Sequence, residues 1–287
     1  MFGKVGLVVV LIAFCTTGCS VLNPDEPQAA YLRIDSISVL NTPATQGTIS
    51  AAISDAWIYV DDQLMGAFEL PCNVPILEEG NHKISVGAGI KINGLSALRA
   101  PYPFYRFDAD SLTLEPGVVH EMAPQVSYFD SLSYAFLADF DDVSGNKLEA
   151  SGASDTTVGI TTANENVFEG NGSFSARLLR DSGIVEFQMV EPVSLPKLGT
   201  LVYMELNYKT THALTLALRS NYPASAPQNT ILISLYPTDE WKKVYVNLTR
   251  AVSEQISASD YQVFFFSFKN AGTEDLEILL DNMKIIY

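Results

Sequence analysis

Residues 262–268 of the chain read QVFFFSF, and four consecutive apolar side chains run from Val263 to Phe266. Phenylalanine and valine favour β-strands. Four exposed apolar residues in a row would promote aggregation, so we predict that this strand is buried on both of its faces. The run therefore marks the interior of a β domain.

Strand-like runs follow one another on both sides of this stretch, separated by turn residues. They are GIVEFQM (183–189), TLVYMELNY (200–208), ALTLALR (213–219), TILISLY (230–236), KKVYVNL (242–248), QVFFFSF itself, EILL (277–280) and NMKIIY (282–287). Eight short strands with turn signals between them predict an antiparallel sandwich over this part of the chain.

Three local motifs resemble the jelly roll of carbohydrate-binding modules. Phe140-Asp141-Asp142 matches the opening segment of that family, EGNGSFSAR (169–177) matches its glycine-containing loop, and LDNMKI (280–285) matches its closing strand. The resemblance implies a jelly-roll domain over residues 138–287. It implies the fold more strongly than a ligand, because these positions are structural in the family and many such domains bind no sugar.

The first half of the chain is also strand-rich, with turn residues between its runs. The runs are YLRIDSISVL (31–40), AWIYVDDQLMGAFEL (56–70), HKISVGAGI (82–90), YPFYRFDADSLTL (102–114) and VVHEMAPQV (118–126). Within AWIYVDDQLMGAFEL, Asp61-Asp62 supply turn chemistry for a hairpin in which Ile58 and Val60 point to one face.

The order of these features between residues 55 and 90 resembles the PEGA-type domain of bacterial envelope proteins. Gly66, Pro71, Pro75 and a turn before His82 carry this resemblance, although Gly66 and Pro71 stand further apart than in that family. We therefore predict an all-β chain of two β-sandwich domains, PEGA/Ig-like over residues 30–126 and jelly roll over residues 138–287. Residues 127–137 are predicted to form a packed connector.

The N-terminal residues MFGKVGLVVVLIAFCTTGC (1–19) resemble a bacterial lipoprotein signal, although Thr16 stands where that motif usually has Leu. The pair Asp25-Glu26 resembles the export signal of some Bacteroidota lipoproteins. Lys4 precedes an apolar run too short to span a bilayer, and Gly18 precedes Cys19. The resemblance implies cleavage after residue 18, a lipid on Cys19, a tether over residues 19–29 and attachment to the outer membrane. The sequence leaves open the periplasmic or the surface face.

Composition excludes some partners. The formal charge of −16 (17 basic and 33 acidic residues) becomes −17 without Lys4 of the signal. Such a chain repels phosphate backbones, so nucleic acid is not an expected partner. Of three cysteines, Cys15 leaves with the signal and Cys19 is lipidated, which leaves Cys72 without an intramolecular disulfide partner.

The sequence indicates no enzyme. It contains no Gly-x-Ser-x-Gly nucleophile elbow, no phosphate-binding Gly-x-x-x-x-Gly-Lys loop and no His-Glu-x-x-His or Cys-x-x-Cys motif. With 33 acidic residues, no carboxylate pair is singled out as the acid and base of a glycosidase.

Aromatic side chains are the candidates for glycan binding, because sugar C–H faces stack on aromatic rings. Tyr222 and Tyr236 lie at predicted strand ends beside proline-containing loops, where we expect them to be exposed and to contact glycan. Trp241 is predicted to pack in the core.

Resemblance to the jelly-roll modules also implies a structural calcium between the first and last strands. Asp139, Asp141, Glu169, the Gly170 carbonyl and Asp281 are the predicted oxygen ligands, a set that Ca²⁺ accepts. The alternative is that Asp141 is a solvated turn residue and that Asp281 caps a hairpin.

The leading hypothesis is a non-catalytic outer-membrane lipoprotein whose jelly roll binds a glycan. The alternative hypothesis is a structural subunit of an outer-membrane assembly or transport complex, docked through the PEGA-like domain. A large flat apolar patch near residues 90–105 would favour the alternative.

Overall fold

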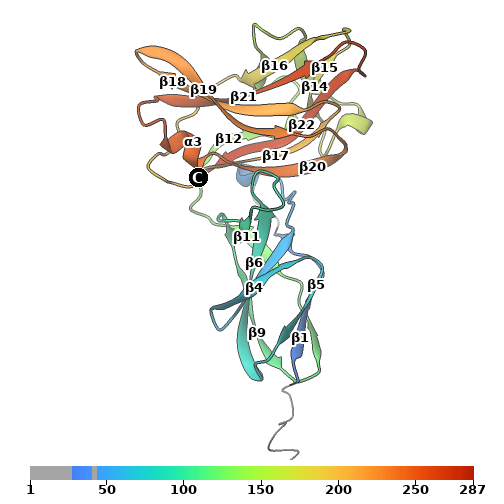
Figure 1. Cartoon of the computed structure of the whole chain (residues 1–287), viewed down its shortest axis with the longest axis vertical. Coiled ribbons are helices and arrows are strands. Elements are labelled where there is room, and N and C mark those ends of the chain that lie inside the picture. The colour runs from blue at the N-terminus through green and yellow to red at the C-terminus, as the bar shows by residue number, and fades with distance from the viewer. Residues whose placement is uncertain (1–27, 41–43) are drawn as a thin grey trace, which may run out of the picture.

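The structure, a computed structural model, describes residues 28–40 and 44–287. It is all-β, as predicted, and consists of two β-sandwich domains stacked end to end (Figure 1). The predicted signal (1–18), Cys19 and most of the tether lie outside the described residues. None of the helices in the described ranges is long and apolar enough to cross a membrane.

The first domain is built from short strands in three sheets. The strands and one 3-10 turn are β1 (Ala30–Ile34), β2 (Ser38–Val39), η1 (Ala44–Gln46), β3 (Asp55–Val60), β4 (Gln63–Glu69), β5 (Cys72–Ile76), β6 (Gly80–Lys91), β7 (Arg99–Pro101), β8 (Tyr105–Arg106), β9 (Asp108–Leu114), β10 (Val119–Glu121) and β11 (Gln125–Tyr128). The orders are β10-β1-β5, β2-β11-β8 and β4-β3-β6-β7, with β9 beside β6.

The β3–β4 hairpin confirms the sequence reading of residues 56–70. Asp61 and Asp62 both adopt positive φ (48° and 64°), the conformation that a two-residue hairpin turn requires. Ile58 and Val60 are buried in the core, as their alternation predicts. Cys72 is half-buried and packs against the same core.

The second domain follows through the predicted connector. Its elements are β12 (Tyr134–Ala138), β13 (Leu148–Ala150), β14 (Val158–Thr161), η2 (Asn164–Asn166), β15 (Ser173–Leu178), β16 (Gly183–Met189), β17 (Tyr203–Thr210), β18 (Leu214–Tyr222), β19 (Ser225–Leu235), β20 (Thr238–Asn247), α3 (Thr249–Ser253), β21 (Asp260–Lys269) and β22 (Leu276–Ile286).

Two antiparallel sheets form this jelly-roll sandwich. The sheet that we call the junction sheet has the order β14-β15-β22-β17-β20, with β12 beside β22, and it faces the first domain. The other, which we call the open sheet, has the order β13-β16-β21-β18-β19 and lies on the side away from the first domain (Figure 1).

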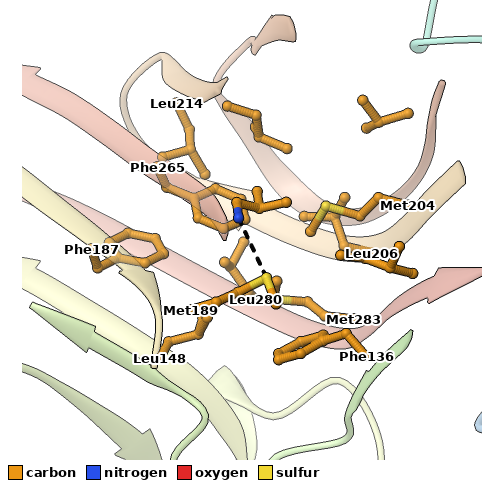
Figure 2. Close-up of a cluster of buried hydrophobic side chains, with 14 of the residues drawn as sticks. Phe136, Leu148, Phe187, Met189, Met204, Leu206, Leu214, Phe265, Leu280 and Met283 are labelled. Carbon is orange, nitrogen blue, oxygen red and sulfur yellow. Dashed lines mark hydrogen bonds between the residues drawn. The ribbon is translucent and has the colours of Figure 1, made fainter. Parts of the chain in front are cut away.

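The core between these sheets is rich in aromatic and sulfur side chains (Figure 2). Phe265 of the open sheet stacks on Phe187, with ring centroids 4.9 Å apart, and both are fully buried. Phe174 of the junction sheet meets Phe187 at 4.6 Å and so joins the two layers. The N–H of Val263 points to the sulfur of Met189 at 3.4 Å.

Two predicted strands, 277–280 and 282–287, are a single strand, β22. The expected break at Asp281-Asn282 is a local irregularity within the strand, where Asn282 has φ of 51° and the pairing with β17 shifts register. A bulge lengthens one strand by a residue without ending it, which sequence cannot distinguish from a turn. The two ends of the connector predicted at 127–137 belong to strands of different domains, β11 of the first and β12 of the second.

The two domains meet at a buried polar cluster on the outer side of the junction sheet. Glu205 of β17 forms an ion pair with Lys243 of β20 at 2.8 Å, and both side chains are almost completely buried. From the first domain, Tyr102 and Tyr128 donate hydrogen bonds to the Glu205 carboxylate at 2.7 and 2.8 Å. Lys284 lies 3.7 Å from the same carboxylate.

Burial and ion pairing strongly shift the pKa values of charged groups in this cluster. Burial raises the pKa of Glu205, but the ion pairs with Lys243 and Lys284 outweigh burial and hold that pKa at about 2. Burial lowers the pKa of Lys284 to about 8 despite its proximity to Glu205. Glu205, Lys243 and Lys284 all belong to the second domain, and the first domain covers them and donates two hydroxyl hydrogen bonds to Glu205. Separating the domains would expose these charges to water and break those hydrogen bonds.

Backbone contacts tie the domains together beside this cluster. The N–H of Asn93 donates to the Tyr245 carbonyl at 2.8 Å, and the N–H of Asn247 donates to Asn93 Oδ1 at 2.8 Å. The Tyr245 hydroxyl accepts the N–H of Ala52 at 3.1 Å. Tyr245 itself is buried in the first domain's core cluster, so that core continues into the second domain.

Candidate functional site

Three phenylalanines form a ladder along the outer face of the open sheet. Phe264, Phe266 and Phe268 alternate on β21 with the inward-facing Val263 and Phe265. The rings of Phe264 and Phe266 are stacked with centroids 5.9 Å apart, and Phe266 meets Phe268 edge-on at 5.7 Å. Exposure rises along the strand, from 6% at Phe264 to 56% at Phe268. We call these three residues the phenylalanine ladder.

A fixed network of polar side chains crosses the sheet at the buried end of the ladder. The Arg219 guanidinium lies over the Phe264 ring, 5.0 Å from its centroid. Arg219 donates to Gln188 Oε1 at 2.6 Å and to Asn229 Oδ1 at 3.2 Å. Gln188 in turn donates to Glu149 Oε1 at 3.1 Å. The network therefore joins β13, β16, β18 and β19 on the outer face.

Sheet register explains why these residues meet. Gln188 of β16 and Ala217 of β18 are opposite Phe264, while Glu186 and Thr215 are opposite Phe266. Cross-strand partners point to the same face, so apolar rings and hydrogen-bonding groups share one surface. Such a surface can stack an apolar face and hold hydroxyl groups at fixed positions.

The prediction that residues 263–266 are buried on both faces is correct for Val263, Phe264 and Phe265 but wrong for Phe266, which is half-buried. In the part of the chain that the structure describes, no second sheet stacks on the outer face of β21. One signal in the sequence could have indicated the outer-face ladder. A phenylalanine stands at every second position from 264 to 268, and this pattern extends past the four-residue run. Arg219 and Gln188 had no local signal, because only the pairing of β16, β21 and β18 brings them to the ladder.

Tyr222 and Tyr236 are not brought together. Tyr222 ends β18 opposite Ser225, whereas Tyr236 follows β19 at the other end of the same strand pair, next to the Leu214–Leu235 pair. Tyr222 packs against the sandwich core, and its hydroxyl donates to Gln255. Tyr236 is 83% exposed. The two rings therefore cannot contribute to one stacking surface.

Trp241 differs from its predicted place in the core. It is half-buried, and its ring lies 5.4 Å from that of Phe168. Both rings line a cleft between the two domains, at whose wall Tyr236 also lies.

The predicted calcium ligands come near one another, but their side chains have other partners. Asp141 accepts the N–H of Asn171, next to Gly170, and Asp139 accepts the N–H of Asp141. Glu169 accepts the side-chain amide of Asn282 at 2.8 Å. The first strand, the loop and the last strand therefore meet in the expected region.

Asp281 is fully buried within β22 and does not cap a hairpin. Burial raises the pKa of its carboxyl to about 7, although hydrogen bonds from the Ser173 hydroxyl (2.6 Å) and the Asn282 N–H (2.7 Å) oppose this shift. Across residues 28–40 and 44–287, no three histidine, cysteine or acidic side chains converge closely enough to hold a metal ion. In this arrangement the predicted ligands do not form a coordination shell.

Comparisons with known proteins find similarity only among solved structures. No protein-family model matches the sequence, and no curated protein matches it. The CBM22-2 xylan-binding domain of Xyn10C from Paenibacillus barcinonensis is 14% identical, over 53% of this chain and 98% of that chain, with a TM-score of 0.41. A structure of carbohydrate-binding modules from the β-sandwich superfamily is also 14% identical, over 83% of this chain and 85% of that chain, with a TM-score of 0.40.

TmCBM61 in complex with β-1,4-galactotriose is 15% identical, over 48% of this chain and 85% of that chain, with a TM-score of 0.31. At these identities and TM-scores neither a ligand nor a site is transferred to this chain.

Proposed function

We propose that this protein is a non-catalytic lipoprotein of the bacterial outer membrane that binds a glycan through its second domain. The observation that carries the proposal is the phenylalanine ladder on an open sheet, beside the Arg219, Gln188 and Glu149 network. Contiguous exposed apolar patches on soluble proteins often mark a ligand or partner site. Here Phe266 and Phe268 supply the exposed ring surface, and Phe264 is 6% exposed.

The ladder fits a sugar chain better than a purely apolar ligand. Sugars combine C–H faces, which stack on aromatic rings, with hydroxyl groups that need hydrogen-bond partners. Arg219, Gln188 and Glu149 are held by one another at 2.6 to 3.1 Å, so their free donors and acceptors are preorganised. Preorganisation reduces the entropy lost on binding.

Binding to polysaccharide tests the proposal. Phe266→Ala and Gln188→Ala are expected to weaken retention of the protein in gels containing the best-bound polysaccharide by about tenfold each, the effect of about 1.4 kcal/mol. Phe129→Ala is the matched control, because Phe129 is an exposed phenylalanine of the first domain with Arg106 5.3 Å from its ring centroid. The proposal would be refuted if the control variant weakened binding equally. It would also be refuted if no envelope or plant polysaccharide retained the wild-type protein.

The membrane attachment rests on the sequence of residues 1–19. We propose that Cys19 carries the lipid, that the PEGA-like domain separates it from the jelly roll, and that the protein lies on the periplasmic or surface side of the outer membrane. Labelled fatty acid should incorporate into the wild type and not into Cys19→Ser, since the glyceride is attached through that thiol. Equal labelling of both would disprove the lipid anchor.

A structural subunit of an outer-membrane complex is the alternative. Leu95 and Leu98, in the loop after β6, are about half exposed and would suit a protein contact. However, Tyr102 and Phe104 of the same region are buried at the junction, where each meets Tyr203 at 5.7 Å between ring centroids. That leaves little of residues 90–105 for a partner. Stoichiometric recovery with an outer-membrane barrel in mild detergent would favour this alternative.

A further inference from the structure

A cleft of about 780 Å³ lies between the two domains, along the outer side and edge of the junction sheet, and the end of β19 (Ser234 and Leu235) also lines it. Its walls come from residues 50–54 and the loop after β6 in the first domain, and from β17, β20 and the β19–β20 turn in the second. Its volume is within the range of small-molecule sites, about 300 to 1,000 Å³.

Aromatic rings form one wall of this cleft. Trp241 is half-buried against Phe168, which fixes its orientation, and Tyr236 stands 83% exposed nearby on the turn that precedes β20. An exposed tyrosine next to a tryptophan held by a second ring offers stacking surface to a ligand.

The charge of the lining is opposite to that of the protein. Among the residues that the structure describes, three lysines (Lys91, Lys242 and Lys243) line the cleft and no carboxylate does, in a chain with 33 acidic and 17 basic residues. Lys243 is neutralised by Glu205 behind the wall. Within the described ranges, the side-chain ammonium groups of Lys91 and Lys242 make neither an ion pair nor a hydrogen bond, so two ammonium groups from different domains have no anionic partner.

Hydrogen bonds between the domains hold these walls in position. Ser50 and Asn207, which both line the cleft, are linked through Oγ and the side-chain amide at 3.1 Å. The contacts of Ala52 and Asn93 with Tyr245 lie at its base. The cleft is therefore preformed and does not depend on a domain closing over the ligand.

We propose that this cleft is a second saccharide site, separate from the ladder, that takes an oligosaccharide containing a uronic acid. The sugar rings stack on Tyr236 and Trp241, and carboxylates of the oligosaccharide receive charge-assisted hydrogen bonds from Lys242 and from Lys91. The net charge, −17 without Lys4 of the predicted signal, repels long polyanions, so the cleft suits a short chain.

The whole chain, purified without its signal, can be tested by calorimetric titration with trigalacturonate. The methyl-esterified trisaccharide, which is neutral, and a sulfated neutral trisaccharide are the comparison ligands. We expect Lys242→Met, Lys91→Met and Tyr236→Ala each to weaken trigalacturonate binding about tenfold, and esterification to weaken it at least as much.

Lys83→Met is the matched control, because Lys83 lies toward the opposite end of β6 from Lys91 and pairs with Asp62 at the surface. It should leave binding unchanged. Tyr236→Ala removes a mostly exposed ring, so loss of binding in that variant cannot be attributed to unfolding.

The ladder variant Phe266→Ala separates this proposal from the proposed function. Trigalacturonate binding that survives Phe266→Ala but falls with Lys242→Met establishes the cleft as a site of its own. Four outcomes would each overturn the cleft proposal, whatever the ladder binds. Trigalacturonate binding could fall with Phe266→Ala alone, or trigalacturonate could fail to bind at all. The methyl ester could bind equally well, or the sulfated sugar could bind better.

Discussion

The ammonium group of Lys284, on the last strand of the second domain, lies 4.3 Å from the centroid of the Tyr128 ring in the first domain. The same ammonium group donates to the Gln46 carbonyl at 3.2 Å. A lysine buried in this way is held by a ring face and a carbonyl in addition to Glu205. The junction therefore joins a charged group of the second domain to a ring and a backbone carbonyl of the first.

Tyr128→Phe tests the hydrogen-bonding half of this arrangement, because it keeps the ring beneath Lys284 and removes only the hydroxyl that donates to Glu205. A hydrogen bond to a buried charge contributes about 1.5–3 kcal/mol, so we expect the free energy of unfolding to fall by about 2 kcal/mol. Urea titration measures this change. Tyr59→Phe, a half-buried first-domain tyrosine that does not contact the cluster, should change it by less than about 0.5 kcal/mol. Equal effects in the two variants would contradict the assigned role.

Acid should weaken the junction through Glu205. Its pKa is about 2 in the folded protein and 4.5 in the unfolded chain, so the unfolded chain binds more protons between these values. The stabilisation is complete above about pH 4.5 and is lost as pH falls toward 2, by about 3 kcal/mol at 1.36 kcal/mol per pKa unit. Urea midpoints at neutral pH and near pH 3 measure the part of this loss that is complete by pH 3, about 2 kcal/mol at 1.36 kcal/mol per pKa unit. Glu205→Gln should already be less stable at neutral pH, and its further loss of unfolding free energy on acidification should be smaller than in the wild type. If that loss is unchanged, other carboxyl groups cause the acid sensitivity.

Two phenylalanines on opposite faces of β21, Phe265 and Phe268, should differ strongly in how much stability is lost when each is truncated. Phe265→Ala leaves a cavity beside Phe187 and should cost about 3–5 kcal/mol of stability. Phe268→Ala removes a ring that is more than half exposed and should cost less than about 0.5 kcal/mol. Thermal unfolding of both variants provides the measurement. A large loss from Phe268→Ala would mean that the outer face is part of the stable core.

The same comparison applies to the two tyrosines that the sequence selected for glycan contact. Tyr222→Ala removes core packing and the hydrogen bond to Gln255, so we expect a loss of at least about 2 kcal/mol. Tyr236→Ala should leave the melting temperature nearly unchanged. If Tyr222→Ala weakens glycan retention without lowering stability, the ring contacts ligand after all.

Calcium remains a proposal for the acidic region around Asp281. A cation bound by Asp281, Glu169 and Asp141 would remove the cost of a buried carboxylate, but it requires Glu169 and Asp141 to turn from Asn282 and Asn171. We expect EGTA to lower the melting temperature by about 5 °C or more. This is the shift expected when a stabilising metal, present at about a hundred times its Kd, is removed. Asp281→Ala should abolish the difference. Identical melting curves with and without chelator, in protein never exposed to added calcium, would leave these carboxylates without a metal.

Local patterns in the sequence predicted what depends on neighbouring residues. The strand at 183–189, the Asp61-Asp62 turn and the inward side of β21 all follow from periodicity and turn chemistry. The environment of the outer side of β21 could not be predicted in the same way. A phenylalanine at every second position fits a strand face exposed to solvent as well as one covered by a second sheet. What decides between them is whether another layer covers the strand, and that is a property of the whole fold.

The two candidate sites depend even more on distant residues. Gln188 and Arg219 are 31 positions apart and meet because β21 lies between their strands. Lys91 and Trp241 line one cleft because the junction sheet packs on the first domain. No spacing rule connects such pairs. In the sequence, Glu205 and Lys243, which form a buried ion pair at the junction, cannot be distinguished from two surface charges.

The end-to-end stacking of the domains has a mechanical consequence. The described chain begins at residue 28 at the far end of the first domain, and the open sheet lies at the opposite end of the molecule (Figure 1). The buried groups and hydrogen bonds that span the junction oppose hinging between the domains, so the first domain acts as a stiff spacer between residue 28 and the open sheet. The phenylalanine ladder therefore lies on the face of the molecule that points away from residue 28.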